Sequence, residues 1–468
     1  MELLSNLLSY LEGKGDAWVV GGALRDQLLG LAALDVDLVT TVAPAALPRS
    51  IWGAEAYAFW LDESRQILRI VRPVGATVDI APLQGKDITA DLGCRDFTVN
   101  AMAMKLEDWL SQAGPLIDPL AGQQDLAARC LRLVTPEALL ADPVRVLRGI
   151  RLAITRDLKI EAATMQAMQL AAAQLSAEAA ERVAAELSSC FIHPRAAAAT
   201  DLLQLTGVTQ SLFPEVTAMH EVTQNKYHQF TVDEHSRKAF AAFVDIVHQG
   251  RYLTPRAQGW LADYWQALSP AVQAAAMLAA WLHDIGKPPT RVIRQGRVTF
   301  YNHERVGAKM AVAIARRLRL SNMQQDLIRR FIQLHMYPLQ LWRSARFGPQ
   351  LIHRFYRRAG EYGPLIVAFT LADHLAKGDN LAGSQEFSAH QQMVEQFLHA
   401  YFCLQQELIS PEPLLDGREL IFLAARPPGP WLRQAKQAVL EAQVAGKIKS
   451  KAEARRWFEK WLDQEKQS

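Results

Sequence analysis

The sequence predicts an α+β protein in which a small α/β head precedes a long and mostly helical body. The first 125 or so residues mix short strand-like runs with helical stretches. From about Leu126 onward, apolar residues recur at helical spacing among Ala, Leu, Gln, Glu and Arg. The chain has 468 residues, which is too long for one compact core, so we expect three or more packed units.

Four runs in the head have the branched or alternating composition of β-strands, namely residues 17–20 (AWVV), 35–40 (DVDLVT), 66–72 (QILRIVR) and 76–82 (ATVDIAP). Turn residues break the helical body at 206–216 and at 408–417, and a further run of turn residues follows at 426–430. We therefore expect a head, a helical neck, a second helical domain and a helical tail. Their predicted ranges are 1–125, 126–220, 221–385 and 386–468.

Composition excludes several classes of protein. Lys and Arg number 51 against 48 Asp and Glu, a net charge of +3, so any nucleic-acid surface must be a local patch. Four cysteines, none in a CxxC pair, support neither a disulfide framework nor a thiolate zinc site. The N-terminus lacks a signal-peptide pattern, and the longest apolar stretch, 271–282, is too short to span a bilayer. We expect a cytoplasmic protein with no membrane contact.

The first group of candidate functional residues lies between residues 17 and 40. A strand that ends in Gly21-Gly22 and leads into a helix can bring its backbone N–H groups close to a phosphate, and Arg25 lies one turn further on. Asp35 and Asp37 are two apart on the next strand, so their carboxylates share a face. Paired carboxylates suit Mg²⁺, although an isolated DxD is usually a solvated strand edge.

A third carboxylate, Asp79, lies on another strand-like run with apolar neighbours. It either completes a metal cluster for an in-line phosphoryl or nucleotidyl transfer or is an ordinary strand-end acid. The spacing leaves both readings open.

The order GGALRD, DVD, VDI, RDFTVNAMA, DPLAGQQDL, ADPVRVLRGIRLA and ERVAAEL over residues 17–216 resembles the class II tRNA nucleotidyltransferase and bacterial poly(A) polymerase family. The resemblance implies that Asp35 and Asp37 hold Mg²⁺, which activates the primer 3′-hydroxyl and binds the triphosphate of CTP or ATP. It places Arg95, Asp96 and Asn100 near the incoming ribose and triphosphate. It also implies that Asp142 and Arg145, with Arg148 in the same motif, bind the nucleotide and read its base edge.

This chain departs from the family pattern at three points. Cys94 stands where the family usually has a second arginine, and Ala141 replaces the acidic residue before Asp142. Only residues 84–93 separate the Asp79 strand from the RD motif, where members that add the terminal A usually carry a longer flexible loop. The short segment favours an enzyme that adds only CC and leaves the A to a separate enzyme.

The second group of candidate residues is rich in histidine and consists of His235, His283, Asp284, His303, His335 and Asp373. These residue types bind divalent transition metals, and several on neighbouring helices can converge in a bundle core. Their order resembles the HD phosphohydrolase superfamily, in which the core motif corresponds to His235, His283, Asp284 and Asp373. His303 and His335 match positions used by members with two metals. The resemblance implies hydrolysis of a 2′,3′-cyclic phosphate or a 2′-phosphate, and a purely structural metal is the alternative.

Arginines crowd between residues 316 and 358, with Phe347, Phe355 and Tyr356 among them. They are either a track for RNA phosphates or solvated helix faces whose arginine stems cover apolar surface. As RNA contacts we single out Arg316, Arg329, Arg330 and Arg357.

Together these patterns predict an RNA nucleotidyltransferase that adds CCA, or CC only, to the tRNA 3′ end from CTP and ATP, with a hydrolase domain behind it. The alternatives are a poly(A) polymerase and an HD phosphohydrolase whose head only binds RNA. The sequence predicts no oligomeric state.

Overall fold

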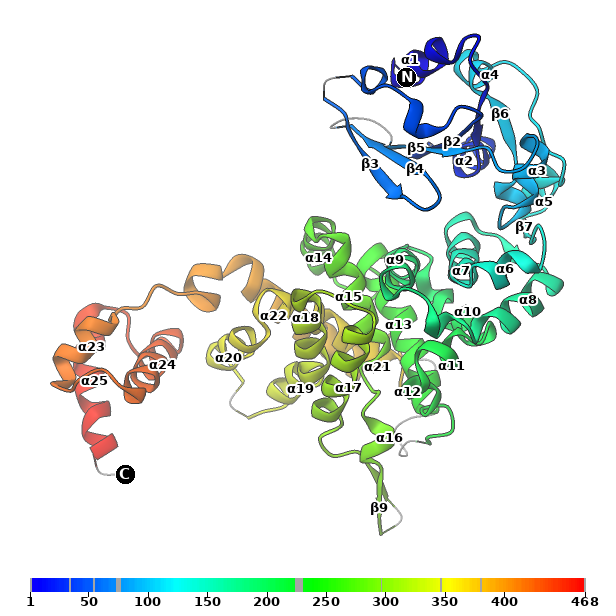
Figure 1. The fold of residues 1–468 in the computed structure, drawn as a ribbon. Helices are drawn as coiled ribbons and strands as arrows, with labels where there is room; N and C mark the ends of the chain where they lie inside the picture. The colour runs from blue at the N-terminus through cyan, green and yellow to red at the C-terminus, as the bar shows by residue number, and fades with distance from the viewer. Residues whose placement is uncertain are drawn as a thin grey trace. The chain divides into compact units, whose positions relative to one another are not determined.

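The structure is a computed structural model that describes residues 2–32, 35–53, 55–72, 77–223, 230–295, 297–345, 347–378 and 381–466. Figure 1 shows strands concentrated in the N-terminal part and helices in the rest, as the composition predicts. The chain divides into two compact units, Met1–Glu186 with Leu202–Leu212, and Leu187–Asp201 with Phe213–Ser468. The finer division into four domains stays a prediction.

A six-stranded sheet forms the centre of the first unit, with the strand order β3-β4-β5-β2-β1-β6. Its strands are β1 (Ala17–Val20), β2 (Asp35–Thr40), β3 (Tyr57–Asp62), β4 (Ile67–Val71), β5 (Thr77–Pro82) and β6 (Ala103–Lys105). β2 and β5 pair in parallel, and the other neighbours are antiparallel. All four predicted strands are confirmed to within a residue at each end, Ala76 lying outside the described residues, whereas β3 and β6 were not predicted.

The two faces of the sheet pack against different helices. Val19 and Leu38 join a core with α1 (Glu2–Leu11) and α4 (Leu106–Ser111). Val20 and Val39, which point the other way, join a smaller core with α3 (Ile88–Gly93). Side chains alternate along a strand, so the carboxylates of Asp35 and Asp37 lie on the same face as Val39.

Several helices lie in the first unit or cross its boundary, because Leu187–Asp201 belongs to the second unit. They are α2 (Gly22–Leu28), α5 (Gly122–Ala127), α6 (Glu137–Ala141), α7 (Val144–Arg156), α8 (Ala162–Ala172), α9 (Ala180–Phe191), α10 (Ala199–Leu205) and α11 (Val208–Leu212), with a short pair β7 (Cys130–Leu131) and β8 (Lys159–Ile160). Gly149 on α7 lets this helix pack closely against Phe97, because a Cβ there would lie 2.7 Å from the ring. On the same helix, Nε of Arg148 lies 2.9 Å from Asp96, the residue before Phe97.

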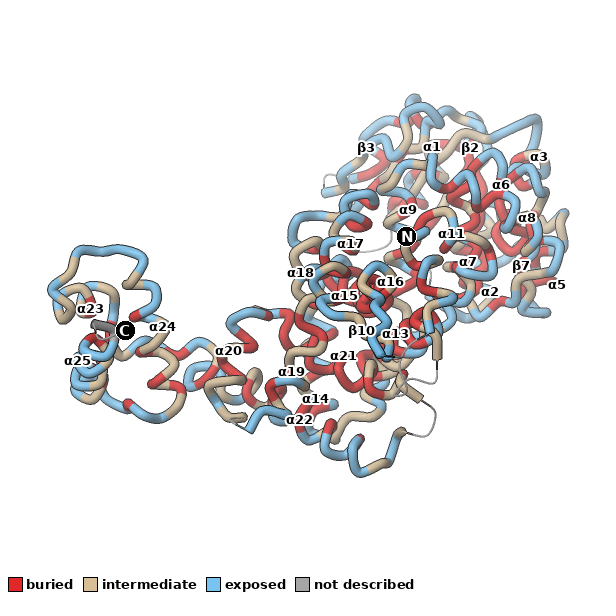
Figure 2. The backbone as a smooth tube through the Cα atoms, turned by 90° about the horizontal axis from the view of Figure 1, so that it is seen from below, coloured by how far each residue is buried: buried red, intermediate tan, exposed pale blue. Residues whose placement is uncertain are grey.

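The second unit is a helical bundle whose central helices are α13 (Val232–Gln249), α15 (Pro270–Trp281), α17 (His303–Arg317), α18 (Asn322–Leu334) and α21 (Gly363–Leu375). Figure 2 shows long buried stretches in α13, α15 and α21. Phe243, Phe331 and Phe369 from three of these helices pack their rings together. Gly286 allows the turn after α15 to touch α17, since a Cβ there would lie 2.1 Å from the carbonyl oxygen of His303.

The second unit contains further elements. They are α12 (Pro214–Thr217), α14 (Pro255–Ala267), α16 (Lys287–Thr290), the hairpin β9 (Val292–Arg294) and β10 (Arg297–Thr299), α19 (Tyr337–Trp342), α20 (Pro349–Ala359), α22 (Gln385–Cys403), a π-helical turn (Gln405–Ile409), α23 (Gly417–Ala424), α24 (Pro430–Val444) and α25 (Lys451–Lys466). Of these, α23, α24 and α25 pack around a small core of their own. The sequence predicted only helix here and missed the hairpin. Across the described residues, no helix is both long enough and apolar enough to span a bilayer.

Candidate functional site

Two carboxylates and an arginine form a row across three neighbouring strands of the sheet, and Asp35 lies two residues before Asp37 on β2. Asp37 on β2 lies directly opposite Asp79 on β5, and Asp79 lies opposite Arg69 on β4. Arg69 binds Asp79 through two hydrogen bonds, 2.8 Å from Nε to Oδ1 and 2.7 Å from Nη2 to Oδ2. The carboxylate of Asp79 is therefore neutralised by Arg69. Among the described residues, no salt bridge joins Asp35 or Asp37 to a basic side chain.

The glycine turn before α2 lies against Asp37. Gly21 has a φ of +69°, in the left-handed region that favours glycine. A Cβ at Gly21 would lie 3.2 Å from Nη1 of Arg95 and 3.5 Å from Oδ2 of Asp37. Gly22, the first residue of α2, is similarly close to Arg25, with 3.4 Å between its would-be Cβ and Nη2. The glycine turn, Arg95 and Asp37 thus lie next to one another.

A hydrogen-bond network lies next to the glycine turn. Arg25 donates from Nη1 to Oδ1 of Asn100, and Asn100 donates from Nδ2 to Oδ1 of Asp96, 3.0 Å away. Nε of Arg148 lies 2.9 Å from the other oxygen of Asp96. Burial alone would raise the pKa of Asp96. Arg148, Asn100 and the Phe97 N–H together lower it by more, so the pKa of Asp96 lies below its ordinary value. Arg25 is buried, and its hydrogen bond holds the side chain of Asn100 in place.

The predicted base-reading residues lie at the start of α7. Asp142 accepts two hydrogen bonds from Nη2 of Arg182 on α9, at 2.9 and 2.8 Å. Arg145 lies 3.9 Å from Asp142 and donates to the backbone carbonyl oxygens of Cys94 and Ala138. The carboxylate of Asp142 is thereby held in a fixed plane with two arginines beside it.

The head carboxylates have the character of a cation site. Burial raises the pKa of Asp37, the charges of Asp79 and Asp35 raise it further, and Arg148 and Arg95 partly oppose this. Like charges held together are relieved when a cation joins them. Hard carboxylate oxygens next to a glycine turn suit a divalent cation shared with a nucleotide.

The six predicted ligands of the helical domain converge, although they come from five places in the sequence. His235 lies on α13, His283 and Asp284 follow α15, and Asp373 lies on α21. His303 begins α17 and His335 follows α18. All four histidines and Asp284 are buried. Two groups can each hold a metal ion, His235 with His283 and Asp284, and Asp284 with His303 and His335.

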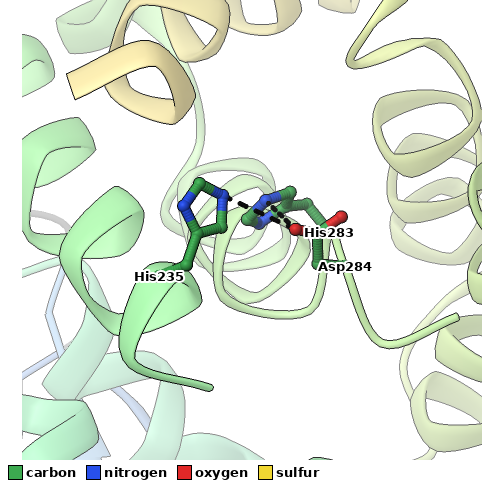
Figure 3. Close-up of side chains that lie close together, drawn as sticks. All are labelled: His235, His283 and Asp284. Atoms are coloured by element: carbon green, nitrogen blue, oxygen red, sulfur yellow. Dashed lines mark ion pairs between the residues drawn. The ribbon is translucent and has the colours of Figure 1, made fainter. Parts of the chain in front are cut away.

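Asp284 stands at the centre of the cluster, and Figure 3 shows His235 and His283 directed toward it. Its Oδ2 lies 3.5 Å from Nε2 of His235 and 3.2 Å from Nε2 of His283. Its Oδ1 lies 3.3 Å from Nε2 of His303. Nε2 of His235 is also 2.9 Å from Oδ1 of Asp373. One carboxylate thus connects the two groups.

Backbone carbonyls orient every histidine of the cluster. Nδ1 of each ring lies 2.7–3.0 Å from a carbonyl oxygen, that of Ala376, Ala280, Phe300 or Ile332. The hydrogen therefore sits on Nδ1 and the lone pair of Nε2 points into the cluster, the arrangement that metal-ligating histidines adopt. Nε2 of His283 and of His303 are buried without a hydrogen-bond partner among the described residues. This donor set fits divalent transition metals.

Without a metal, the electrostatics of this cluster are uneven. Burial lowers the pKa of His335, helped by His283 and His303, to about 3. Burial also lowers that of His283, but Asp284 and Asp373 outweigh it and raise the pKa to about 9. The cluster therefore contains one histidine whose surroundings oppose protonation and one whose surroundings favour it.

A cavity of about 510 Å³ opens onto the cluster. Asp284, His303, His335 and Asp373 line it together with Lys287, Lys377 and the segment from Val298 to Glu304. Nζ of Lys287 lies 2.5 Å from Oδ2 of Asp284. The two lysines thus provide cationic groups on a wall that also carries the carboxylates of Asp284, Glu304 and Asp373.

The four candidate RNA contacts differ in their surroundings. Arg329 and Arg330 are both paired with Asp326, and Arg316 contacts Gln325. Arg357 has no carboxylate partner among the described residues. It lines a cavity of about 670 Å³ between α20 and the tail, together with Arg358, Arg433 and Lys436. The arginines therefore do not form one continuous free track.

Sequence reasoning missed several residues of the two sites, among them Arg69, Arg182, Lys287 and Lys377. Arg182 lies inside the ERVAAEL motif that supported the family resemblance, so that motif already contained the signal. Lys287 is three residues from Asp284 and Lys377 four from Asp373, spacings that place them beside the ligands on a helix. Arg69 had no signal, because its pairing depends on strand register.

Three family profiles match the chain. The Poly A polymerase head domain covers residues 77–132, the "Probable RNA and SrmB- binding site of polymerase A" covers 157–219, and the HD domain covers 259–378. None of them covers Asp35, Asp37 or His235.

Among curated proteins, the A-adding tRNA nucleotidyltransferase of Deinococcus radiodurans is 32% identical over 459 residues, 96% of each chain. The CC-adding tRNA nucleotidyltransferase of Thermus thermophilus is 31% identical, over 95% of this chain and 94% of the relative. Among solved structures, the Bacillus stearothermophilus CCA-adding enzyme in complex with CTP aligns with a TM-score of 0.65 at 20% identity, over 100% of this chain and 98% of that one. The Thermotoga maritima CCA-adding enzyme complexed with tRNA gives 0.63 at 20% identity, over 98% and 94%.

Proposed function

Because this chain belongs to the class II tRNA nucleotidyltransferase and bacterial poly(A) polymerase family, we propose that it transfers nucleotides from CTP or ATP to the 3′ end of tRNA. One observation supports this most strongly. The glycine turn, Arg95 and the carboxylates of β2 lie around one space at the edge of the sheet. That arrangement combines a triphosphate site with a cation site, which is what nucleotidyl transfer needs. We place the reaction in the cytoplasm.

At the head, Asp35 and Asp37 would hold Mg²⁺, with Asp79 as a third carboxylate whose charge Arg69 balances. Bound Mg²⁺ supplies the positive charge that activates the 3′-hydroxyl and offsets the charge of the triphosphate. Burial, together with the negative charges of Asp79 and Asp35, raises the pKa of Asp37. A bound cation would offset this negative charge.

The arginines around the glycine turn would bind the triphosphate and ribose. Arg95 borders the turn, and its Nε and Nη2 also contact Asp91, at 3.2 and 3.0 Å, which fixes the guanidinium plane. Gly21 and Gly22 leave room for phosphate oxygens. Asp96 and Asn100 form the buried support, with Arg25 behind them, and the exposed Arg148 pairs with Asp96.

Asp142 and Arg145 would read the base of the incoming nucleotide, with Arg182 as a third member of the group. Aspartate supplies acceptors and arginine supplies donors, so together they can match the edge of cytosine or adenine. Arg182 holds the Asp142 carboxylate in plane, which makes the choice of base depend on a residue of α9.

Arg357 is the RNA contact that we favour in the second unit, because it lines a cavity with three further cations. Phosphate contacts of this kind give affinity without sequence preference. Arg316, Arg329 and Arg330 would add to it only after leaving their present partners.

The histidine cluster supports a second activity, hydrolysis of a 2′,3′-cyclic phosphate or a 2′-phosphate. His235, His283, Asp284 and Asp373 would hold one divalent transition metal, and Asp284, His303 and His335 a second. A bound metal supplies a water of lowered pKa for attack on the phosphoester. Lys287 and Lys377 would hold the phosphate in the cavity.

Two subtypes of the transfer reaction are candidates, addition of CC and addition of the final A. The segment after β5 consists of a short connection and α3, and Asp91 of α3 binds both the Gln84 N–H and Arg95. This anchored segment favours addition of CC alone. The similarity to an A-adding relative favours the second candidate, addition of the final A.

Single-turnover extension distinguishes these reactions. Three tRNA transcripts, ending before CCA, after C and after CC, are each given CTP, ATP or both with Mg²⁺. Addition of two Cs that stops there supports CC addition, and one A added only after CC supports A addition. Ordered addition of CCA would show that the short segment after β5 does not limit the enzyme to CC. A long ladder of A additions would point to a poly(A) polymerase. No incorporation on any transcript would contradict the proposed transfer.

A further inference from the structure

The outer strand of the sheet exposes aromatic rings on a surface that no role described above uses. Tyr57 and Phe59 on β3 are 70% and 39% exposed, and their ring centroids lie 5.8 Å apart. β3 is the edge strand of the sheet. Proteins normally protect edge strands with charge or cover them, so two neighbouring exposed rings at an edge indicate a binding surface. We call Tyr57 and Phe59 the β3 ledge.

Strand register connects the β3 ledge to the catalytic carboxylates. Phe59 lies directly opposite Arg69, Arg69 opposite Asp79, and Asp79 opposite Asp37. Residues directly opposite one another point to the same face of a sheet, and the two hydrogen bonds from Arg69 to Asp79 agree with this. The ledge therefore shares a face with the carboxylates, about 14 Å away, three strand spacings of about 4.8 Å each.

The ledge lies on the opposite side of Asp37 from the triphosphate site. Gly21 and Arg95 border Asp37 on the β1 side, whereas β5, β4 and β3 follow on the other. In an in-line transfer, the attacking hydroxyl approaches opposite the leaving pyrophosphate. A primer whose 3′-hydroxyl approached Asp37 from the side of β5 would carry its last nucleotides over β4 and β3.

We propose that the β3 ledge is a stacking platform for the unpaired nucleotides just upstream of the primer 3′ end. Aromatic rings bind single-stranded RNA by stacking on bases, whichever base is present. This tolerance suits a primer whose last base changes with every addition. Arg69, between the ledge and Asp79, pairs with Asp79, so this carboxylate does not repel an RNA backbone that crosses it. The inference rests on the proposed transfer to an RNA 3′ end.

A fluorescence titration tests the platform without needing catalysis. A tRNA with 2-aminopurine in its unpaired 3′-terminal segment is titrated with protein in the absence of nucleotide, and quenching reports stacking. We expect the double substitution Tyr57→Ala with Phe59→Ala to abolish the quenching and to raise the Kd of the RNA about tenfold or more. KM for the nucleotide in single-turnover extension should stay within about twofold.

Matched variants keep the result interpretable. Tyr57→Phe keeps the ring and should behave as the wild type, and Phe422→Ala removes an 83% exposed ring from the other unit as a control. Phe59→Leu preserves apolar volume without the ring, and it serves if the double variant fails to fold. Unchanged quenching and RNA affinity in a folded ledge variant would overturn the proposal, as would a change of oligomeric state alone. Extension without any effect of the ledge would refute only the platform, whereas quenching without extension would refute only the transfer.

Discussion

The carboxylates of the head and the histidines of the bundle are held in place by different groups. Arginine side chains surround the head carboxylates, Arg69 at Asp79 and Arg148 near Asp37. In the bundle, backbone carbonyls fix all four histidine rings, and Asp284 lies among them. Side-chain partners can rearrange when a charged substrate arrives, but carbonyls of packed helices stay in place.

This difference has a consequence for metal binding. The head offers hard oxygen ligands that are incomplete without substrate phosphates, as is usual for Mg²⁺. The bundle offers a nearly complete set of nitrogen and oxygen ligands, which suits a tightly held transition metal. We therefore expect the head to take up its metal with the nucleotide and the bundle to retain its own.

The largest effect is expected from Asp37→Asn. Loss of this carboxylate should slow nucleotide addition on the order of 10³-fold or more, because charge stabilisation at the reacting phosphate is lost. Single-turnover extension of tRNA with CTP measures it. Asp62→Asn, an exposed carboxylate on β3, serves as the control and should change the rate less than twofold. A folded Asp37→Asn enzyme with full activity would remove this residue from the metal site.

Asp284→Asn should separate the two sites. Because Asp284 connects both groups of ligands, the variant should lose its bound transition metal and its phosphodiesterase activity, while tRNA extension stays within about twofold. Elemental analysis and hydrolysis of a nucleoside 2′,3′-cyclic phosphate measure the first two. His399→Asn, outside the cluster, is the matched control. Equal loss of extension in a folded variant would show that the sites depend on one another.

Arg182→Ala should affect the choice of base more than the rate. Without its partner, Asp142 loses two charge-assisted hydrogen bonds, so discrimination between CTP and ATP should fall about tenfold. The ratio of kcat/KM for the two nucleotides measures this. Arg151→Ala, which breaks a pair with Glu186 on the same two helices, should leave the ratio unchanged. An unchanged ratio in Arg182→Ala would exclude this arginine from base reading.

The smallest effects concern stability, where two head aspartates should behave oppositely. The pKa of Asp96 is lowered on folding, so its charge stabilises the fold above the ordinary pKa of about 3.9, and the contribution is lost as the pH falls through the lowered value. Asp96→Asn should therefore lower the unfolding temperature at pH 7, by less near pH 3. The pKa of Asp37 is raised by burial, so in metal-free buffer Asp37→Asn should raise the unfolding temperature at pH 7. Thermal unfolding across this pH range measures both, and shifts of the same sign would contradict the assignment.

How much the sequence could predict depends on how local each feature is. Asp35 and Asp37 share a strand, and His283-Asp284 are adjacent, so local spacing was enough to find them. The Arg69–Asp79 pair depends on the register between β4 and β5, and the β3 ledge lies on a strand whose run YAFWLD gave no clear alternation. Contacts between distant helices, such as Arg182 with Asp142, required the fold.

Removal and selective return of metal tests most directly whether the chain has two independent metal sites. The protein is treated with a strong chelator until elemental analysis finds no metal, and Mg²⁺ is then added with tRNA and CTP. We predict that extension returns fully with Mg²⁺ alone, while phosphodiesterase activity stays absent until a transition metal is supplied. Extension that also requires the transition metal, or hydrolysis restored by Mg²⁺ alone, would contradict the separation of the two sites.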